Sequence, residues 1–233
     1  MKLALLIGCL VSCVAAAAAD AAVVTYTTGA DVYIEWSHTD GGYTNRNSKG
    51  LLKTQWSTGG GSVTSIVKSY IKFEVPAGMA SVNAVTLRLT SRDVGESDND
   101  GDPVEIWALP NAYDGWDETV LTWAQATSTY GNDPNGWYFT VGEQVGSGTC
   151  NAGKGVATDF SLDAAKLLSA AQADTDGVIT LVLAANPATT YWCCRENSTA
   201  DHRPQLAWDY EVPEPATISL LVLGGLACLR RRK

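Results

Sequence analysis

Short segments in which apolar and polar residues alternate fill the middle of this chain. Val85, Leu87 and Leu89 are separated by single polar or small residues, so they share one face of an extended strand. Thr86 and Arg88 point to the other face. A period of two is typical of a strand with one buried side, and it excludes a helix at these positions.

Further segments have the same alternation or are rich in β-branched and aromatic residues, and turn-forming Gly, Asn and Asp residues separate them. One segment, 162–173, has a helical stripe of Leu and Ala that Ser161 or Asp163 can cap. Many strands with one short helix predict an all-β fold, an antiparallel β-sandwich that is jelly-roll-like. The strands are expected at 30–36, 50–56, 65–75, 83–90, 104–109, 137–141, 156–160, 178–184, 190–195 and 205–210.

Residues 1–22 have the pattern of a secretory signal peptide, which is expected to form a helix. Lys2 is followed by an apolar run over 3–14 and then by small residues, as cleavage sites require. Cleavage after Ala19 or after Ala22 fits this pattern. A retained membrane anchor is the weaker alternative, because the apolar run is short for a bilayer of about 30 Å.

The other end of the chain, 212–233, has a proline-flanked acid, an apolar run and a basic terminus. Pro213, Glu214 and Pro215 precede the uncharged segment 218–229, and residues 230–233 are all basic. The apolar segment predicts a single short hydrophobic helix, which suits a transient membrane anchor better than a permanent one. The basic terminus would remain cytoplasmic and would place the domain outside. An ordinary single-pass tail remains the alternative.

The string VPEPATISLLVLGGLACLRRRK at 212–233 resembles the PEP-CTERM sorting signal of Gram-negative bacteria. The resemblance implies processing by exosortase, a membrane peptidase. It also implies delivery to the outer cell surface or the extracellular matrix, with transient anchoring in the inner membrane.

The region between the two ends, 23–211, is expected to be one domain. It contains 11 Lys and Arg against 23 Asp and Glu, which gives a net charge of −12. A surface of this charge repels nucleic acid and anionic lipid. Neutral glycans, cations or a soluble matrix role remain compatible with it.

Five strings within residues 30–210 resemble, in this order, the DNRLRE domain, which is also classed as carbohydrate-binding module family 96. The resemblance implies a β-sandwich, and some members of that family bind acidic polysaccharide such as alginate. The strings are SYIKFEVP at 69–76, VNAVTLRL at 82–89, VEIWAL at 104–109, WDETVLTW at 116–123 and CRENSTADHRPQLAWDY at 194–210.

The densest motif is Trp116–Trp123, and it has two interpretations. Glu118 could be a catalytic acid with Asp117 as its partner, as in a polysaccharide-degrading enzyme. We favour a structural role instead, in which Trp123 fills the edge of the sandwich and Glu118 accepts hydrogen bonds from backbone amides. Arg195 and Glu196 could likewise bind a sugar, but a cross-strand pair that stabilises a sheet is favoured.

Aromatic residues near turns are candidates for stacking on sugar rings, because aromatic faces present large apolar areas. The predicted carbohydrate-binding residues are Trp36, Tyr43, Trp56, Tyr113, Trp116 and Trp137, with Arg46 as a hydrogen-bond donor.

A calcium site is a further hypothesis, at Asp98, Asp100 and Asp102. Hard oxygen ligands at alternating positions around a glycine suit Ca²⁺, and a solvated hairpin loop is the alternative. No other cofactor is predicted.

Three cysteines remain in the domain, and an exported protein can form disulfides. Cys193 and Cys194 would point to opposite faces of a strand, so only one of them can reach Cys150 from a given face. The pair Cys150–Cys194 is slightly favoured.

These observations predict a non-catalytic, surface-sorted β-sandwich protein that binds polysaccharide. Its expected partners are exosortase, a polysaccharide and, through the tail, the membrane; nucleic acid is not expected. A structural matrix or envelope protein without a specific ligand is one alternative, and a polysaccharide-degrading enzyme is the other.

Overall fold

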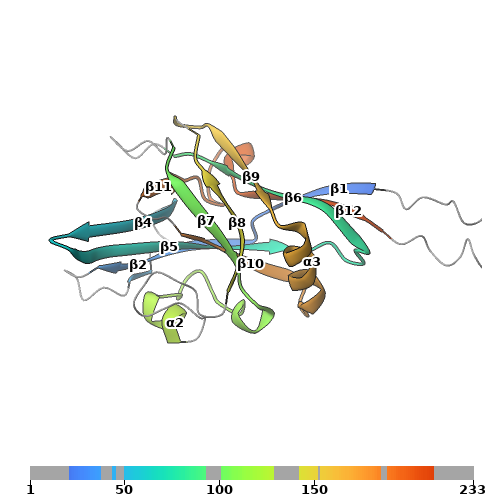
Figure 1. The fold of residues 1–233 in the computed structure, drawn as a ribbon, viewed down its shortest axis with the longest axis horizontal. Coiled ribbons are helices and arrows are strands. Elements are labelled where there is room, and N and C mark those ends of the chain that lie inside the picture. The colour runs from blue at the N-terminus through green and yellow to red at the C-terminus, as the bar shows by residue number, and fades with distance from the viewer. Residues whose placement is uncertain are drawn as a thin grey trace, which may run out of the picture.

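The computed structural model describes residues 21–37, 44–45, 50–92, 101–128, 142–151, 153–184 and 188–212. Within these ranges two antiparallel sheets pack face to face, so the predicted antiparallel sandwich is confirmed (Figure 1). The smaller sheet has the order β1 (Ala21–Thr27), β12 (Gln205–Glu211), β6 (Ser81–Thr90) and β9 (Ala157–Leu162).

The larger sheet is built around β5 (Ser62–Glu74), the longest of the strands in the described ranges. Its order is β11 (Thr189–Trp192), β4 (Leu52–Gly59), β5, β10 (Val178–Ala184), β7 (Pro103–Ala108) and β8 (Glu143–Thr149). Off this path, β2 (Ala30–Ser37) pairs with β5, and β3 (Thr44–Asn45) pairs with β2.

The strand order is that of a jelly roll with an insertion. Without β2, β3, β4 and β11, the two sheets read β1-β12-β6-β9 and β5-β10-β7-β8. Four strands in each sheet, joined by long crossovers between the sheets, is the eight-stranded jelly-roll arrangement. The inserted strands lengthen the larger sheet at one end of the molecule, where the β4–β5 hairpin extends from the body (Figure 1).

The larger sheet divides along β5. Val67 pairs with Glu35 on one side and Gln55 on the other, whereas Tyr70 pairs with Val32 and Val182. A strand has only two edges for pairing. β2 occupies one edge of β5, so β4 and β10 share the other edge, with β4 pairing along the first half of β5 and β10 along the second half. At the division the side chain of Ser69 replaces a ladder bond, because its Oγ accepts from the Lys53 backbone N–H and donates to the Lys53 carbonyl oxygen.

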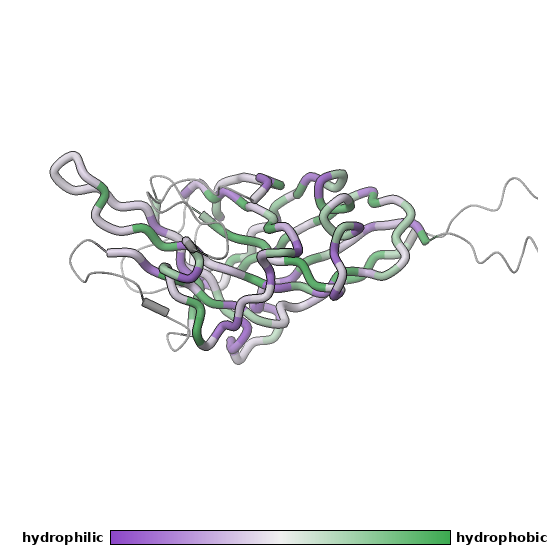
Figure 2. The backbone as a smooth tube through the Cα atoms, turned by 90° about the horizontal axis from the view of Figure 1, so that it is seen from below, coloured by the Kyte–Doolittle hydropathy of each residue, from purple (hydrophilic) through white to green (hydrophobic). Residues whose placement is uncertain are grey.

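The main core lies between the two sheets. Leu87 and Leu206 of the smaller sheet and Ile71 and Leu181 of the larger one are fully buried there. Burying each such side chain contributes about 1.5–3 kcal/mol. Figure 2 shows hydrophobic residues distributed along the strands in the body of the molecule, with hydrophilic residues between them.

A second core covers the outer face of the larger sheet. The segment 109–128, which includes the 3₁₀ turn η2 (Asn111–Tyr113) and the helix α2 (Trp123–Ser128), packs on this face. Trp116 is its anchor: the indole N–H donates to Thr180 Oγ1 over 2.9 Å, and the ring meets Tyr70 edge-on at 5.8 Å.

The predicted helix is confirmed as α3 (Ala164–Ala173). Asp163 is the N-cap residue, and its carboxylate accepts from the backbone N–H groups of Ala165 and Lys166. Leu162, which the sequence placed in the helix, ends β9 instead. The strand expected at 137–141 lies outside the described residues.

The chain enters and leaves the sandwich at the same place. Ala21 pairs with Glu211, so the first residue of β1 lies beside the last residue of β12 (Figure 1). Residues 1–20 of the predicted signal peptide 1–22 and the predicted hydrophobic segment 218–229 lie outside the described residues, whereas Ala21 and Ala22 begin β1. In the part of the chain that is described, no helix has the length and apolarity that crossing a membrane demands.

Candidate functional site

Arg195 lies in the turn after β11 and joins three separate parts of the chain. Its Nη2 lies 2.6 Å from Glu118 Oε1, and its backbone N–H donates to Asp31 Oδ2 over 2.7 Å. The backbone N–H of Asp31 donates in turn to Glu118 Oε2, over 3.2 Å. The three residues therefore form a closed ring that ties β2, the 109–128 segment and this turn together.

Two further contacts hold the same guanidinium. Arg195 Nη1 donates to the Gly29 carbonyl oxygen over 2.6 Å, and Nε donates to Glu196 Oε1 over 3.0 Å. Arg195 and Glu196 are neighbours in a turn, so the predicted cross-strand pairing between them is wrong. The structural role of Glu118 and Arg195 that the sequence favoured takes the form of this network.

Asp31 is the most buried carboxylate of the network, at 2% exposure. Burial raises its pKa to about 7; the hydrogen bond from the Arg195 backbone opposes this rise, and the negative charges of Glu196 and Glu118 add to it. The thiol of Cys194 lies beside it, and burial, with the charge of Asp31, raises the pKa of Cys194 to about 12.

Trp116 and Trp123 are structural residues. Their exposures are 3% and 1%, so neither ring is open to a sugar. The prediction that Trp116 stacks on a glycan is therefore wrong, because its ring is buried in the second core. Lys72 completes its surroundings, with Nζ 4.7 Å from a Trp116 ring centroid and donating to the Trp116 carbonyl oxygen.

Trp36 and Trp56 lie in one row across three strands. Both pair with Ile66 of β5, one from β2 and the other from β4, so the three side chains share a face. Both tryptophans are half-buried, as is Tyr113 beside the second core. Tyr43, Arg46 and Trp137 of the predicted carbohydrate-binding set lie outside the described residues.

One of the three predicted calcium ligands lies within the described residues, and the other two do not. Asp102 is half-buried just before β7, whereas Asp98 and Asp100 lie outside the described residues. The three cysteines of the domain, Cys150, Cys193 and Cys194, are buried free thiols, so the favoured Cys150–Cys194 disulfide is not formed in this structure.

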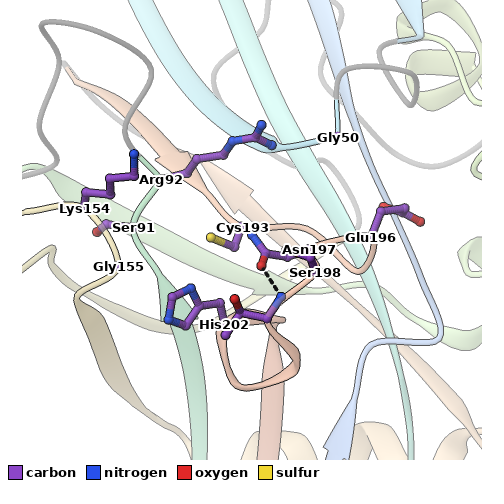
Figure 3. A pocket seen from close by; sticks show the side chains of 11 residues that line it. Gly50, Ser91, Arg92, Lys154, Gly155, Cys193, Glu196, Asn197, Ser198 and His202 are labelled. Carbon is purple, nitrogen blue, oxygen red and sulfur yellow. Dashed lines mark hydrogen bonds between the residues drawn. The ribbon is translucent and has the colours of Figure 1, made fainter.

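A polar cleft opens next to the Arg195 turn, with a volume of about 570 Å³ (Figure 3). The end of β6, the turn before β9 and the loop after β11 meet around it. Figure 3 shows the Arg92 side chain extending toward Gly50, with His202 below. The lining residues are Gly50, Ser91, Arg92, Lys154, Gly155, Cys193, Glu196, Asn197, Ser198, Thr199 and His202.

Hydrogen bonds fix the backbone around this cleft. The Thr199 N–H donates to Asn197 Oδ1 over 2.9 Å, and Arg203 Nε donates to the Asn197 carbonyl oxygen over 2.9 Å. On the opposite side, the backbone N–H of Gly155 donates to the Ser91 carbonyl oxygen over 2.9 Å. The walls are thus held in place before any ligand arrives, which lowers the entropic cost of binding.

The cleft combines opposite charges. Arg92 and Lys154 are cations within a strongly acidic domain. Burial opposes ionisation of Glu196, but hydrogen bonds from Arg195 and from the Cys194 thiol outweigh it and lower the pKa of Glu196. The lining therefore contains two cationic side chains, and its carboxylate, Glu196, is engaged by Arg195.

Of the residues that line this cleft, the sequence analysis considered Glu196 for sugar binding, and it did not predict a site at the others. His202, which belongs to no recognisable catalytic or metal-binding motif in the sequence, is half-buried in the cleft wall. The signal that could have identified it was the polar string at 194–210, which was noticed only as part of a family resemblance.

A family model described as the PEP-CTERM protein-sorting motif matches residues 211–233. The match includes Pro213, Glu214 and Pro215, so the predicted sorting signal is confirmed. The fold and this motif together define an exported β-sandwich protein that is sorted to the cell surface by way of exosortase. No curated protein matches the chain.

Proposed function

We propose that this protein is a non-catalytic module that binds an acidic polysaccharide at the outer cell surface or in the extracellular matrix. The observation that carries the proposal is the cleft: a domain with a net charge of −12 gathers Arg92 and Lys154 around one polar hollow. A patch of this kind attracts anions locally even where the distant field repels them.

The chemistry of the cleft suits a uronic-acid sugar. A guanidinium such as that of Arg92 can hold a carboxylate through two parallel hydrogen bonds. Asn197, Ser198 and His202 offer donors and acceptors for sugar hydroxyl groups. A volume of about 570 Å³ falls within the range of small-molecule sites, and we expect it to hold a short stretch of a chain.

Two further observations support this proposal. The cleft wall contains part of the string at 194–210, which resembles the DNRLRE domain, and binding of acidic polysaccharide occurs in that family. Among the described residues that line the cleft, Glu196 is the one with a carboxylate. Glycoside hydrolysis normally uses two carboxyl groups, so binding without catalysis fits this lining better.

The sorting tail determines the proposed location of the module at the cell surface. Glu211 ends β12, and Pro213, Glu214 and Pro215 follow after the single residue Val212. Removal of the chain after this point would leave the sandwich whole, and the transient membrane anchor would then release the module to the surface.

Calorimetric titration of the full chain in a non-ionic detergent, with sodium alginate and with neutral dextran, tests the proposal. We expect binding to alginate that weakens with added salt, and none to dextran. Arg92→Ala should weaken alginate binding at least about tenfold, which corresponds to ~1.4 kcal/mol. Arg88→Ala is the matched control, because Arg88 pairs with Asp159 on the exposed face of the smaller sheet.

The proposal fails if Arg92→Ala binds alginate as tightly as the unmodified chain does. Absence of binding to any glycan would leave a structural matrix role as the better account.

A further inference from the structure

Three aspartates that the cleft does not use meet at another place in the fold. Asp114 follows η2, while Asp174 and Asp176 belong to the turn between α3 and β10. Each carboxylate places one oxygen within 4.8 Å of an oxygen of the other two. The exposure increases from buried Asp114 through half-buried Asp174 to exposed Asp176, so the group opens to solvent on one side.

Local hydrogen bonds orient the group. Asp174 Oδ2 accepts from the backbone N–H groups of Gly177 and Val178, over 2.5 and 3.0 Å, and Asp176 Oδ1 also accepts from Val178, over 3.1 Å. Asn111 Nδ2 donates to Thr175 Oγ1 over 2.9 Å and ties the two loops together. These hydrogen bonds fix the two loops, so the fold itself holds the three carboxylates close to one another.

Two oxygens of the group lack a partner. Asp114 is 5% exposed, and among the described residues its Oδ2 has no hydrogen-bond donor. The Oδ1 atom of Asp174 is also buried and has no hydrogen-bond donor among the described residues. Buried polar atoms in folded proteins nearly always have a partner, and leaving a carboxylate oxygen without one is costly.

The charges around the three aspartates also favour a bound cation. The carboxylates of Asp174 and Asp176 lie beside buried Asp114, and Lys72 is a cation whose charge acts on Asp114. Lys72 is already engaged by the Trp116 carbonyl oxygen and ring. A bound cation would offset the mutual repulsion of the three carboxylates and would provide a partner for the two unpartnered oxygens.

We propose that Asp114, Asp174 and Asp176 bind a calcium ion. All the ligand atoms are hard carboxylate oxygens, which favour Ca²⁺ over softer transition metals. Ca²⁺ accepts six to eight ligands in irregular geometry, and the exposed side at Asp176 leaves room for water to complete the shell. The ion would fasten the 109–128 segment, which covers the second core, to the α3–β10 turn. This inference does not depend on the proposed polysaccharide binding.

The test measures thermal unfolding of the full chain in detergent, first in EDTA and then in CaCl₂. At a calcium concentration of about 100 times the Kd, the Tm should rise by about 5–10 °C. Asp114→Asn should abolish this rise. In EDTA the same variant should unfold at or above the Tm of the unmodified chain, because it removes repulsion, and this result would show that the variant folds.

The matched control is a chain with Asp98→Asn, Asp100→Asn and Asp102→Asn, which removes the calcium loop that the sequence suggested. It should keep the full calcium response. An unchanged Tm for the unmodified chain in calcium would overturn the inference, and so would a response that survives in Asp114→Asn or disappears in the control. An equal response to MgCl₂ would overturn the choice of calcium.

Discussion

The guanidinium of Arg195 lies 2.6 Å from the carboxylate of Glu118, a residue 77 positions earlier in the chain. This contact joins two sequence motifs that have no obvious relation to each other, the tryptophan motif at 116–123 and the Arg-Glu pair after β11. It places both at the junction between the larger sheet and the segment that covers it, beside the proposed binding cleft.

The Glu118–Arg195 contact should stabilise the fold measurably. Glu118→Ala removes the acceptor of both Arg195 and the Asp31 backbone N–H, so we expect it to lower the free energy of unfolding by about 2–4 kcal/mol. A double-mutant cycle with Arg195→Ala, measured by urea unfolding, should give a coupling of about 1–3 kcal/mol.

The Arg88–Asp159 pair is the control for that cycle. It is also short, at 2.7 Å, but both side chains are about half exposed, at 48% and 47%. Its coupling should stay below about 1 kcal/mol. Equal couplings for the two pairs would contradict a special role for Arg195.

Asp31 should make stability depend on pH. Burial raises its pKa from 3.8 to about 7 in the folded protein, so between about pH 4 and 7 the folded state binds more protons than the unfolded state. The free energy of unfolding should therefore fall as the pH rises through this window and level off above it. Urea unfolding at a series of pH values, in EDTA, measures the slope.

Asp31→Asn should flatten that slope, because the amide cannot ionise while its oxygen can still accept from the Arg195 N–H. The variant should also be more stable than the unmodified chain at pH 8. The same slope in both proteins would show that the ionisation of Asp31 does not couple to folding. The charged groups around it, Glu118, Glu196 and Arg195, would then have to compensate fully.

A side chain at Gly146 of β8 should destabilise the fold. A Cβ at this position would lie 2.6 Å from Leu162 Cδ2, where the two sheets approach each other. We expect Gly146→Ala to lower the free energy of unfolding by about 1–3 kcal/mol in urea. Gly115→Ala, with nothing within 4 Å of the added carbon, should change it by less than about 1 kcal/mol; equal effects would refute the close approach.

Signal peptidase should cut after Ala19 and not after Ala22. β1 begins at Ala21, and the pairs Ala21–Glu211 and Ala22–Tyr210 close the edge of the smaller sheet beside the sorting tail. Cleavage after Ala22 would remove both pairs. Amino-terminal sequencing of the exported protein should therefore begin at Asp20, and a start at Val23 would contradict this expectation.

Much of the fold could be predicted from the sequence because strands with one buried face alternate in a visible way. Val85, Leu87 and Leu89 are the example in β6, and Asp163 marked the start of α3. β8 was not among the predicted strands, because glycines such as Gly146 and Gly148 are typical of turns. They are instead small residues beneath Leu162 and Phe160.

The candidate sites were harder to predict, because each one is assembled from distant segments. The register that brings Arg195 to Glu118 is a property of the packed sheets, and no local pattern encodes it. Asp114 and Asp174 are likewise far apart in the chain, whereas the aspartates at 98–102 form a visible pattern because they are close in sequence. Trp116 shows the opposite error, since a tryptophan near a turn looks exposed until the surface that it covers is known.

Hydrogen exchange of the full chain with and without sodium alginate tests the proposed binding most directly. We predict slower exchange at Ser91 and Arg92 and through 193–202, the walls of the cleft, with no change in β2 and β4 around Trp36 and Trp56. Slower exchange confined to those two strands, or no change anywhere in the protein, would contradict the assignment of binding to this cleft.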